Sequence, residues 1–231
     1  MLFSPSIPEI AQRDRFIRRI VGQRMVFCVA GEDGLARVDS RHFRGRQATL
    51  VWSARAEAER WASTLVAHPR LKEIPLGAFL AEVLPTLAGL KRLVAPDWSA
   101  DPIEVELQPM DLAERVRLEA VEAFVQRVKV RRAAWMLEDS SGPALLVSAT
   151  RADQLFLPCW SSRREAETRI EGPWKDMLAV EIPLDNLLSM TLPWLDQRGW
   201  LIAPDHCEGA GALELAPAEL KARFVGMPAL A

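Results

Sequence analysis

The sequence of 231 residues contains no tyrosine, only three cysteines and only three histidines. Cys28, Cys159 and Cys207 are far apart and form no C-x-x-C pair, which argues against a disulfide framework and against a structural zinc site. No two histidines lie four residues apart, so the helical histidine pair typical of many metal sites is missing too. We therefore expect neither a metal site nor another cofactor.

Signals for catalysis, for membranes and for nucleic acid are also missing. The chain has no Gly-rich phosphate loop, no G-x-S-x-G turn and no H-E-x-x-H pair. No apolar run reaches the roughly 18 residues of a membrane span, and the N-terminal segment lacks the charged-then-apolar order of a signal peptide. The formal net charge is -2, with acids and bases interspersed, which favours neither nucleic acid nor a membrane as partner. We expect a cytoplasmic protein whose partner the sequence does not identify, another protein being one candidate.

The hydrophobic content of 49% and the charged content of 26% are typical of a soluble globular chain, with one large domain or two of about 100 residues. "WSARAEAE", which begins at Trp52, returns as "WSSRREAE" at Trp160, 108 positions later. Over residues 16–115 and 124–223 the same offset needs no gap and gives 29 identities in 100 positions. Composition alone would give about 7. The chain is therefore predicted to be a tandem duplication, with copies at residues 1–117 and 118–231.

Each copy is expected to be a small α+β domain with about three helices and a mixed or antiparallel sheet of five strands. Ser6 and Glu9 form a capping-box pattern, which predicts a helix that ends near residue 20. Short apolar or alternating runs predict strands at 24–31, 35–40, 47–52, 92–97 and 103–109. Pro75, or Pro183 in the second copy, is expected in the first turn of another helix, because its missing N–H is harmless there.

The junction between the copies is predicted to be a helix and not a flexible linker. Residues 110–130 contain no glycine or proline and keep an apolar stripe that includes Leu112, Val116, Phe124 and Val128. We expect one continuous helix that is the last element of the first copy and the first element of the second, and that holds the copies rigidly.

The second copy contains "LPCWSSRREAE", the lone Trp174, "IPLDNLLSMTLPWL" and "PAEL". With these motifs each copy resembles the uncharacterised bacterial family called domain of unknown function 2750. The first copy departs from the pattern, because it lacks the proline before Trp52 and has Gly77 where Asp185 stands in the second copy. The second copy is thus the closer relative. The resemblance implies no known activity.

Two interpretations compete for the polar residues that both copies share around the repeated motif. They could form a binding site at the carboxyl ends of strands, where helix N-termini attract ligands. Alternatively, the serines cap helices, the glutamates favour the helix dipole and the tryptophans anchor the core. The candidate binding residues are Trp52, Arg55, Glu57 and Asp97, with their equivalents Trp160, Arg163, Glu165 and Asp205.

No catalytic residue is assigned. Asp205, His206 and Cys207 place a carboxylate, an imidazole and a thiol side by side, but neighbours in an extended segment point to alternating faces, and catalytic triads are assembled from distant positions. The first hypothesis is a non-enzymatic binding or regulatory protein of the adaptor or immunity type, which uses a surface built from both copies. The alternative is an enzyme that binds a small molecule or an anion near the Trp-Ser-x-Arg-x-Glu turn.

Overall fold

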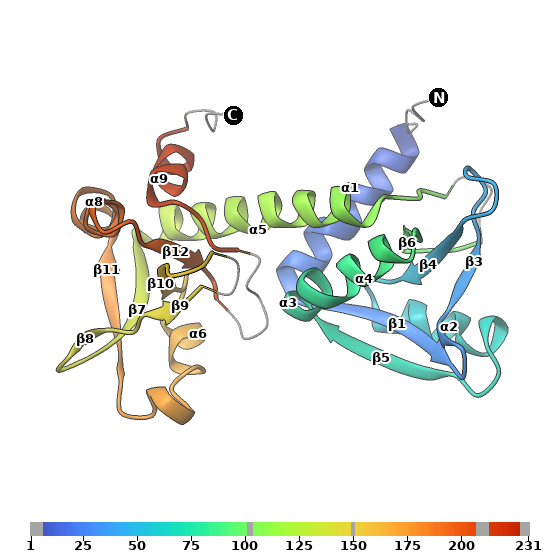
Figure 1. Cartoon of the computed structure of the whole chain (residues 1–231), viewed down its shortest axis with the longest axis horizontal. Helices are drawn as coiled ribbons and strands as arrows, with labels where there is room; N and C mark the ends of the chain where they lie inside the picture. Colours follow the sequence, from blue (N-terminus) through green and yellow to red (C-terminus); the bar gives the residue numbers. More distant parts are fainter. Residues whose placement is uncertain (1–6, 101–103, 149–150, 207–212, 227–231) are drawn as a thin grey trace. The chain divides into compact units, whose positions relative to one another are not determined.

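The computed structural model describes residues 7–100, 104–148, 151–206 and 213–226, and Figure 1 shows the chain. The chain divides into two compact units, Met1–Glu119 and Ala120–Ala231. Each unit mixes helices with small sheets, so the α+β prediction with two tandem copies is confirmed. Ser6, the expected helix cap, lies outside the described residues.

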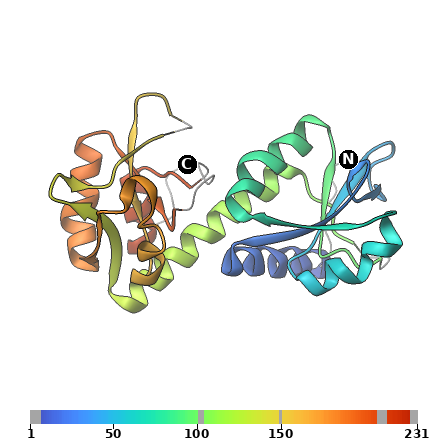
Figure 2. The same cartoon turned by 90° about the horizontal axis from the view of Figure 1, so that it is seen from below.

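The first unit starts with a helix, continues through two hairpin-like strand groups and returns to helix. Its elements are α1 (Ile7–Gln23), β1 (Met25–Gly31), β2 (Gly34–Leu35), β3 (Arg37–Asp39), β4 (Gln47–Val51), α2 (Arg55–Leu65), β5 (Arg70–Pro75), α3 (Leu76–Ala78), the π turn η1 (Phe79–Val83), α4 (Leu84–Gly89) and β6 (Leu93–Pro96). The long strands β1 and β5 run antiparallel, side by side (Figure 2).

The strands of the first unit form two sheets of three strands, in the orders β2-β1-β5 and β3-β4-β6. The expectation of one five-stranded sheet is therefore wrong. Strand β1 pairs with β2 and with β5, an element that the charged run before Pro75 concealed. It meets the end of β4 only through one bridge between Phe27 and Trp52. The expected last strand, 103–109, contributes one bridge, from Leu107 to Val94, within its described part.

The second unit repeats this order at an offset of 108. It contains β7 (Ala133–Asp139), β8 (Gly142–Pro143), β9 (Leu146–Val147), β10 (Leu155–Cys159), α6 (Arg163–Glu167), the 3-10 turn η2 (Gly172–Trp174), β11 (Leu178–Pro183), α7 (Leu184–Asn186), the π turn η3 (Leu187–Thr191), α8 (Leu192–Gln197), β12 (Leu201–Pro204) and α9 (Pro217–Val225). Helix α6 is shorter than its equivalent α2. Gly172 and Pro173 prevent α6 from reaching the length of α2, because glycine is a poor helix former and the residue before proline avoids the α conformation.

A π turn interrupts the same helical segment in both units. Pro85 and Pro193 stand in the first turn of α4 and α8, directly after η1 and η3. A proline has no N–H for the carbonyl four residues earlier, and its ring crowds that carbonyl, so a wider turn accommodates it. Pro75 and Pro183 lie one residue before the expected helix, as the last residues of β5 and β11.

Helix α5 (Pro109–Arg131) is continuous across the junction, as predicted. Asp111 in its first turn and Lys129 and Arg131 in its last turn suit the helix dipole. Leu112 and Val116 are buried in the first half, and Phe124, Val125 and Val128 belong to the core of the second unit.

The repeated tryptophans are core residues. Trp52 and Trp160 have 0% of their surface exposed and pack among buried aliphatic side chains. Leu84, Leu192 and Ile182 are buried as well, whereas Ile74 is only half-buried. Among the described helices, none is both long and apolar enough to cross a membrane.

A strand-end network as candidate functional site

The candidate site of each unit forms where two neighbouring parallel strands end. β4 pairs in parallel with β6, and β10 pairs in parallel with β12, so the residues after each pair meet at one edge of the sheet. The Trp-Ser pair follows the first strand, and an aspartate follows the proline that ends the second. Asp97 and Asp205 adopt the left-handed conformation, with φ of 49° and 47°, which aspartate tolerates better than most residues.

In the first unit the aspartate binds both polar groups of the serine. Asp97 accepts the Ser53 N–H at 2.7 Å through Oδ1 and the Ser53 hydroxyl at 3.0 Å through Oδ2. The indole N–H of Trp52 donates to the Trp98 carbonyl at 2.8 Å. The carboxylate therefore satisfies an amide that a strand end leaves open, and the tryptophan fixes the loop that follows the aspartate.

Neutral amides from α1 complete this network. Gln12 Nε2 donates to the Pro96 carbonyl at 2.9 Å, and Gln23 Nε2 donates to the Ser53 carbonyl at 2.6 Å. Helix α1 thus contacts both strand ends through side-chain amides.

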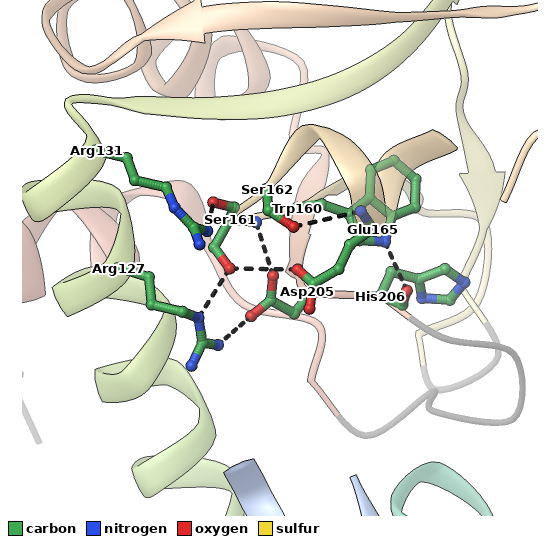
Figure 3. Close-up of polar contacts among 8 residues, drawn as sticks. All are labelled: Arg127, Arg131, Trp160, Ser161, Ser162, Glu165, Asp205 and His206. Atoms are coloured by element: carbon green, nitrogen blue, oxygen red, sulfur yellow. Dashed lines mark hydrogen bonds and ion pairs between the residues drawn. The ribbon is translucent and has the colours of Figure 1, made fainter. Parts of the chain in front are cut away.

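The second unit keeps the aspartate but surrounds it with charge (Figure 3). Asp205 Oδ1 accepts the Ser161 N–H at 2.8 Å, while its Oδ2 forms an ion pair with Arg127. Arg127 Nε also donates to the Ser161 hydroxyl at 2.9 Å, and that hydroxyl donates to Glu165 at 3.4 Å. Arg131 donates to the Ser161 carbonyl at 2.5 Å. Ser161 is therefore held by two arginines of α5 and by two carboxylates.

His206 closes the same network through its backbone. Its carbonyl accepts the indole N–H of Trp160 at 2.8 Å, and its ring lies 5.2 Å from that of Phe156. Burial, with a smaller contribution from Arg169, lowers the pKa of His206 from 6.5 to about 4. The imidazole is thus neutral at physiological pH. Cys207, the third residue of the sequence triplet, lies outside the described residues.

Helix capping differs between the two units. Ser162 accepts the Glu165 N–H at 3.3 Å and so caps α6. The equivalent Ala54 offers no side-chain cap to α2.

The predicted site residues fall into two groups. The structure brings the tryptophans and aspartates of both copies into the network, and Glu165 joins it in the second copy. Arg55 and Arg163 lie instead on the surface, each 2.8 Å from the glutamate one helical turn further on. Hydrogen bonding to Glu59 raises the pKa of Arg55, and Glu57 lies 3.7 Å from the guanidinium of Arg60.

Sequence reasoning missed several residues of these networks. Arg127 and Arg131 lie in α5, whose apolar stripe predicts a helix but no site. A second repeated contact joins Ser40 to Glu106 at 2.5 Å and, in the second unit, Ser148 to Glu214. Both of these pairs are identical at the 108-residue offset, so the repeat itself contained the signal.

The polar residues of the site join two strand ends, and we call the contact of Asp97 with Ser53, or of Asp205 with Ser161, the backbone clamp. Ser161 accepts from an arginine, and arginine stays protonated and cannot act as a general base. Burial raises the pKa of Cys28 to about 12, and burial together with Asp205 raises the pKa of Cys159, so both thiols stay protonated. Over the described parts of the chain, no three His, Cys, Asp or Glu side chains gather as metal ligands would.

Comparison with known proteins identifies a family and little else. The family model described as "Protein of unknown function (DUF2750)" matches residues 13–116 and again residues 121–224. Among curated proteins no relative matches. The solved structure "Anabaena Tic22 (protein transport)" is similar at 9% identity and a TM-score of 0.25, over 83% of this chain and 91% of that one. The structure "Tic22 from Plasmodium falciparum" is similar at 10% identity and a TM-score of 0.24, over 92% of this chain and 99% of that one. At such scores neither likeness supports an argument about fold or function.

Proposed function

We propose that this chain, which belongs to the DUF2750 family through both of its copies, is a cytoplasmic binding or regulatory protein of the adaptor or immunity type and not an enzyme. The use of the repeated polar residues supports this proposal. Asp97 and Asp205 accept the amide protons of Ser53 and Ser161. The carboxylates that could have served catalysis therefore hold strand ends together.

The repeated charges that stay in contact with solvent suit recognition of another protein. The side chains of Arg55 and Arg163 are 59% and 68% exposed, and each stands in the first turn of its helix at the equivalent position of its unit. Arginine is enriched where proteins bind one another, because its planar group forms several directed hydrogen bonds. We assign Arg55 with Glu57 in the first unit, and Arg163 in the second unit, to the surfaces that recognise the partner.

The test starts from the tagged full chain, cross-linked in its own cell and purified with its partner. A true partner is expected to bind again when both proteins are purified separately. Arg55→Glu and Arg163→Glu form a matched pair of charge reversals on exposed positions, and at least one of them should weaken that binding. Lys175→Glu, an exposed reversal in the second unit, is the control that should bind normally.

The alternative, an enzyme that binds an anion or a small molecule, is favoured by one feature of the second unit alone. Arg127, Arg131 and Glu165 all reach Ser161 there, and the Arg127 side chain is 36% exposed. A screen of hydrolase and transferase substrates decides between the proposals. Turnover by the pure chain that Ser161→Ala abolishes would contradict the binding proposal.

A further inference from the structure

A pocket of the first unit lies apart from the strand-end network. The loop between β3 and β4 and the end of α4 surround it, and its volume is about 990 Å³. That volume is at the upper end of the range, roughly 300 to 1,000 Å³, of pockets that bind small molecules. Its lining residues are Asp39, Ser40, Arg44, Gly45, Arg46, Gln47, Ala88, Leu90, Lys91, Arg92 and Gln108.

The lining carries four cations against one carboxylate. Arg46 is oriented by neutral acceptors, since its Nε donates to the Lys91 carbonyl at 2.8 Å and its Nη2 donates to Gln108 at 3.2 Å. Within the described residues, no carboxylate forms an ion pair with Arg44, Arg46, Lys91 or Arg92. The four cationic residues of the lining therefore have no ion-pair partner in the described part of the chain.

The backbone at Lys91 supports a use for this charge. Lys91 adopts the left-handed conformation with φ of 55°, which glycine enters without strain and a lysine does not. The equivalent residue of the second copy is Gly199, with φ of 65°. The first copy thus places a cation, at some conformational cost, where its own repeat has the unstrained residue.

The second copy lacks this cluster of cations, so the fold itself does not require it. Only one cation, Arg198, stands at the positions 108 residues further on, and two carboxylates join it. Those positions are Val147, Ser148, Ala152, Asp153, Gln154, Leu155, Asp196, Arg198, Gly199, Trp200 and Ala216. Arg198 lies over the rings of Trp194 and Trp200, at 4.7 Å and 5.6 Å.

We propose that the pocket between the β3–β4 loop and α4 binds a small phosphate-bearing molecule. Guanidinium groups match phosphate oxygens with paired N–H donors, and Lys91 adds a point charge. The pocket is larger than a phosphate group, and Leu90, 55% exposed, offers an apolar wall to the rest of the molecule. A phosphate ester or a diphosphate of a small metabolite fits this description. The proposal adds a ligand to the chain and does not depend on a protein partner.

The test is calorimetric titration of the full chain with inorganic pyrophosphate and with ATP as probes, at 50 mM and 200 mM NaCl. At least one probe is expected to bind, more weakly at the higher salt, because the attraction is between charges. Lys91→Gly and Arg92→Gln should each lower the affinity at least about tenfold, as expected when a hydrogen bond to a charged group is lost. Arg198→Gln removes the one cation at the equivalent positions of the second copy and should leave the affinity unchanged.

Lys91→Gly separates loss of a contact from loss of the fold. Glycine relieves the left-handed strain, so this variant should melt at the wild-type temperature or above it while binding the probe less well. Two results would overturn the proposal: neither pyrophosphate nor ATP binds, or the Lys91→Gly/Arg92→Gln double variant binds them as well as the wild type does. Neither result bears on whether a protein partner exists.

Discussion

The two copies solve one structural problem with different chemistry. In each copy the serine N–H after one strand needs an acceptor. An aspartate in the left-handed conformation, after the neighbouring parallel strand, accepts it. In the first copy this aspartate also takes the Ser53 hydroxyl, and neutral glutamine amides bind the carbonyls. In the second copy arginines bind the aspartate and the serine.

Identical residues do not guarantee identical contacts. Arg19 stands at the position of Arg127 in the repeat, yet it is exposed, whereas Arg127 binds Ser161 and Asp205. The repeated feature is the backbone clamp, and the charges around it are particular to one copy. A function shared by both copies should therefore not need Arg127, and a function that needs it should belong to the second copy.

The largest expected effect tests what the copies have in common. Trp52→Ala and Trp160→Ala each remove a fully buried indole and its hydrogen bond, so each should lower the free energy of unfolding by about 3 to 5 kcal/mol. Hydrogen exchange read separately in the two units measures this, with the half-buried Trp194→Ala as control. Wild-type protection in Trp160→Ala would place the motif on the surface.

The next effect tests where the copies differ. Asp205→Ala leaves the Ser161 amide and the Arg127 guanidinium without their acceptor, so we expect a loss of about 3 to 4 kcal/mol. Asp97→Ala leaves only neutral donors unsatisfied and should cost about 1 to 3 kcal/mol. Urea denaturation of both variants measures the difference. Equal losses would mean that the ion pair with Arg127 adds nothing.

The sequence predicts the features that depend on spacing along the chain, and it does not predict contacts between distant segments. The offset of 108 predicts the duplication, and the apolar stripe of residues 110–130, without glycine or proline, predicts the continuous helix α5. Both signals depend on spacing along the chain. The sequence does not indicate strand β5, because its outward residues are charged and its partners in β1 lie 40 to 50 residues away. Short sequence patterns indicate local strand preference, but they do not indicate which distant strand will pair with which.

The site shows the same limit. Their repetition in both copies makes Trp160, Glu165 and Asp205 site candidates, and the structure brings them together. Arg163 repeats equally well but binds its own helical neighbour, Glu167. A residue at helical spacing from an opposite charge has a partner already in its own helix. Arg127 and Arg131 had no such signal in their own sequence, because their partners lie about 30 or more residues away.

The third prediction concerns acid. His206 stays neutral in the folded chain to about pH 4, whereas the unfolded chain takes up the proton below about pH 6.5. Protons therefore favour unfolding, and stability that is fully present above pH 6.5 should fall toward pH 4 by at most about 1.4 kcal/mol per pH unit. The equivalent residue of the first copy is Trp98, which does not titrate.

Urea denaturation of the wild type and of His206→Gln at pH 7, 6 and 5 measures this effect. The variant should lose part of the pH dependence, and the imidazole resonances of His206 should titrate near pH 4. A pKa near 6.5 in the folded chain would contradict the burial of the ring.

The smallest expected effect asks whether charge matters where the copies make the same contact. Arg131 donates to the Ser161 carbonyl at 2.5 Å, and the equivalent Gln23 donates to the Ser53 carbonyl at 2.6 Å. A glutamine amide therefore suffices for this bond in one copy, and Arg131→Gln should cost less than about 1 kcal/mol. Arg131→Ala removes the donor altogether and should cost more than the glutamine variant. If glutamine and alanine destabilise the second unit equally, then the arginine acts through its charge, and the two copies differ at this contact as well as at the aspartate.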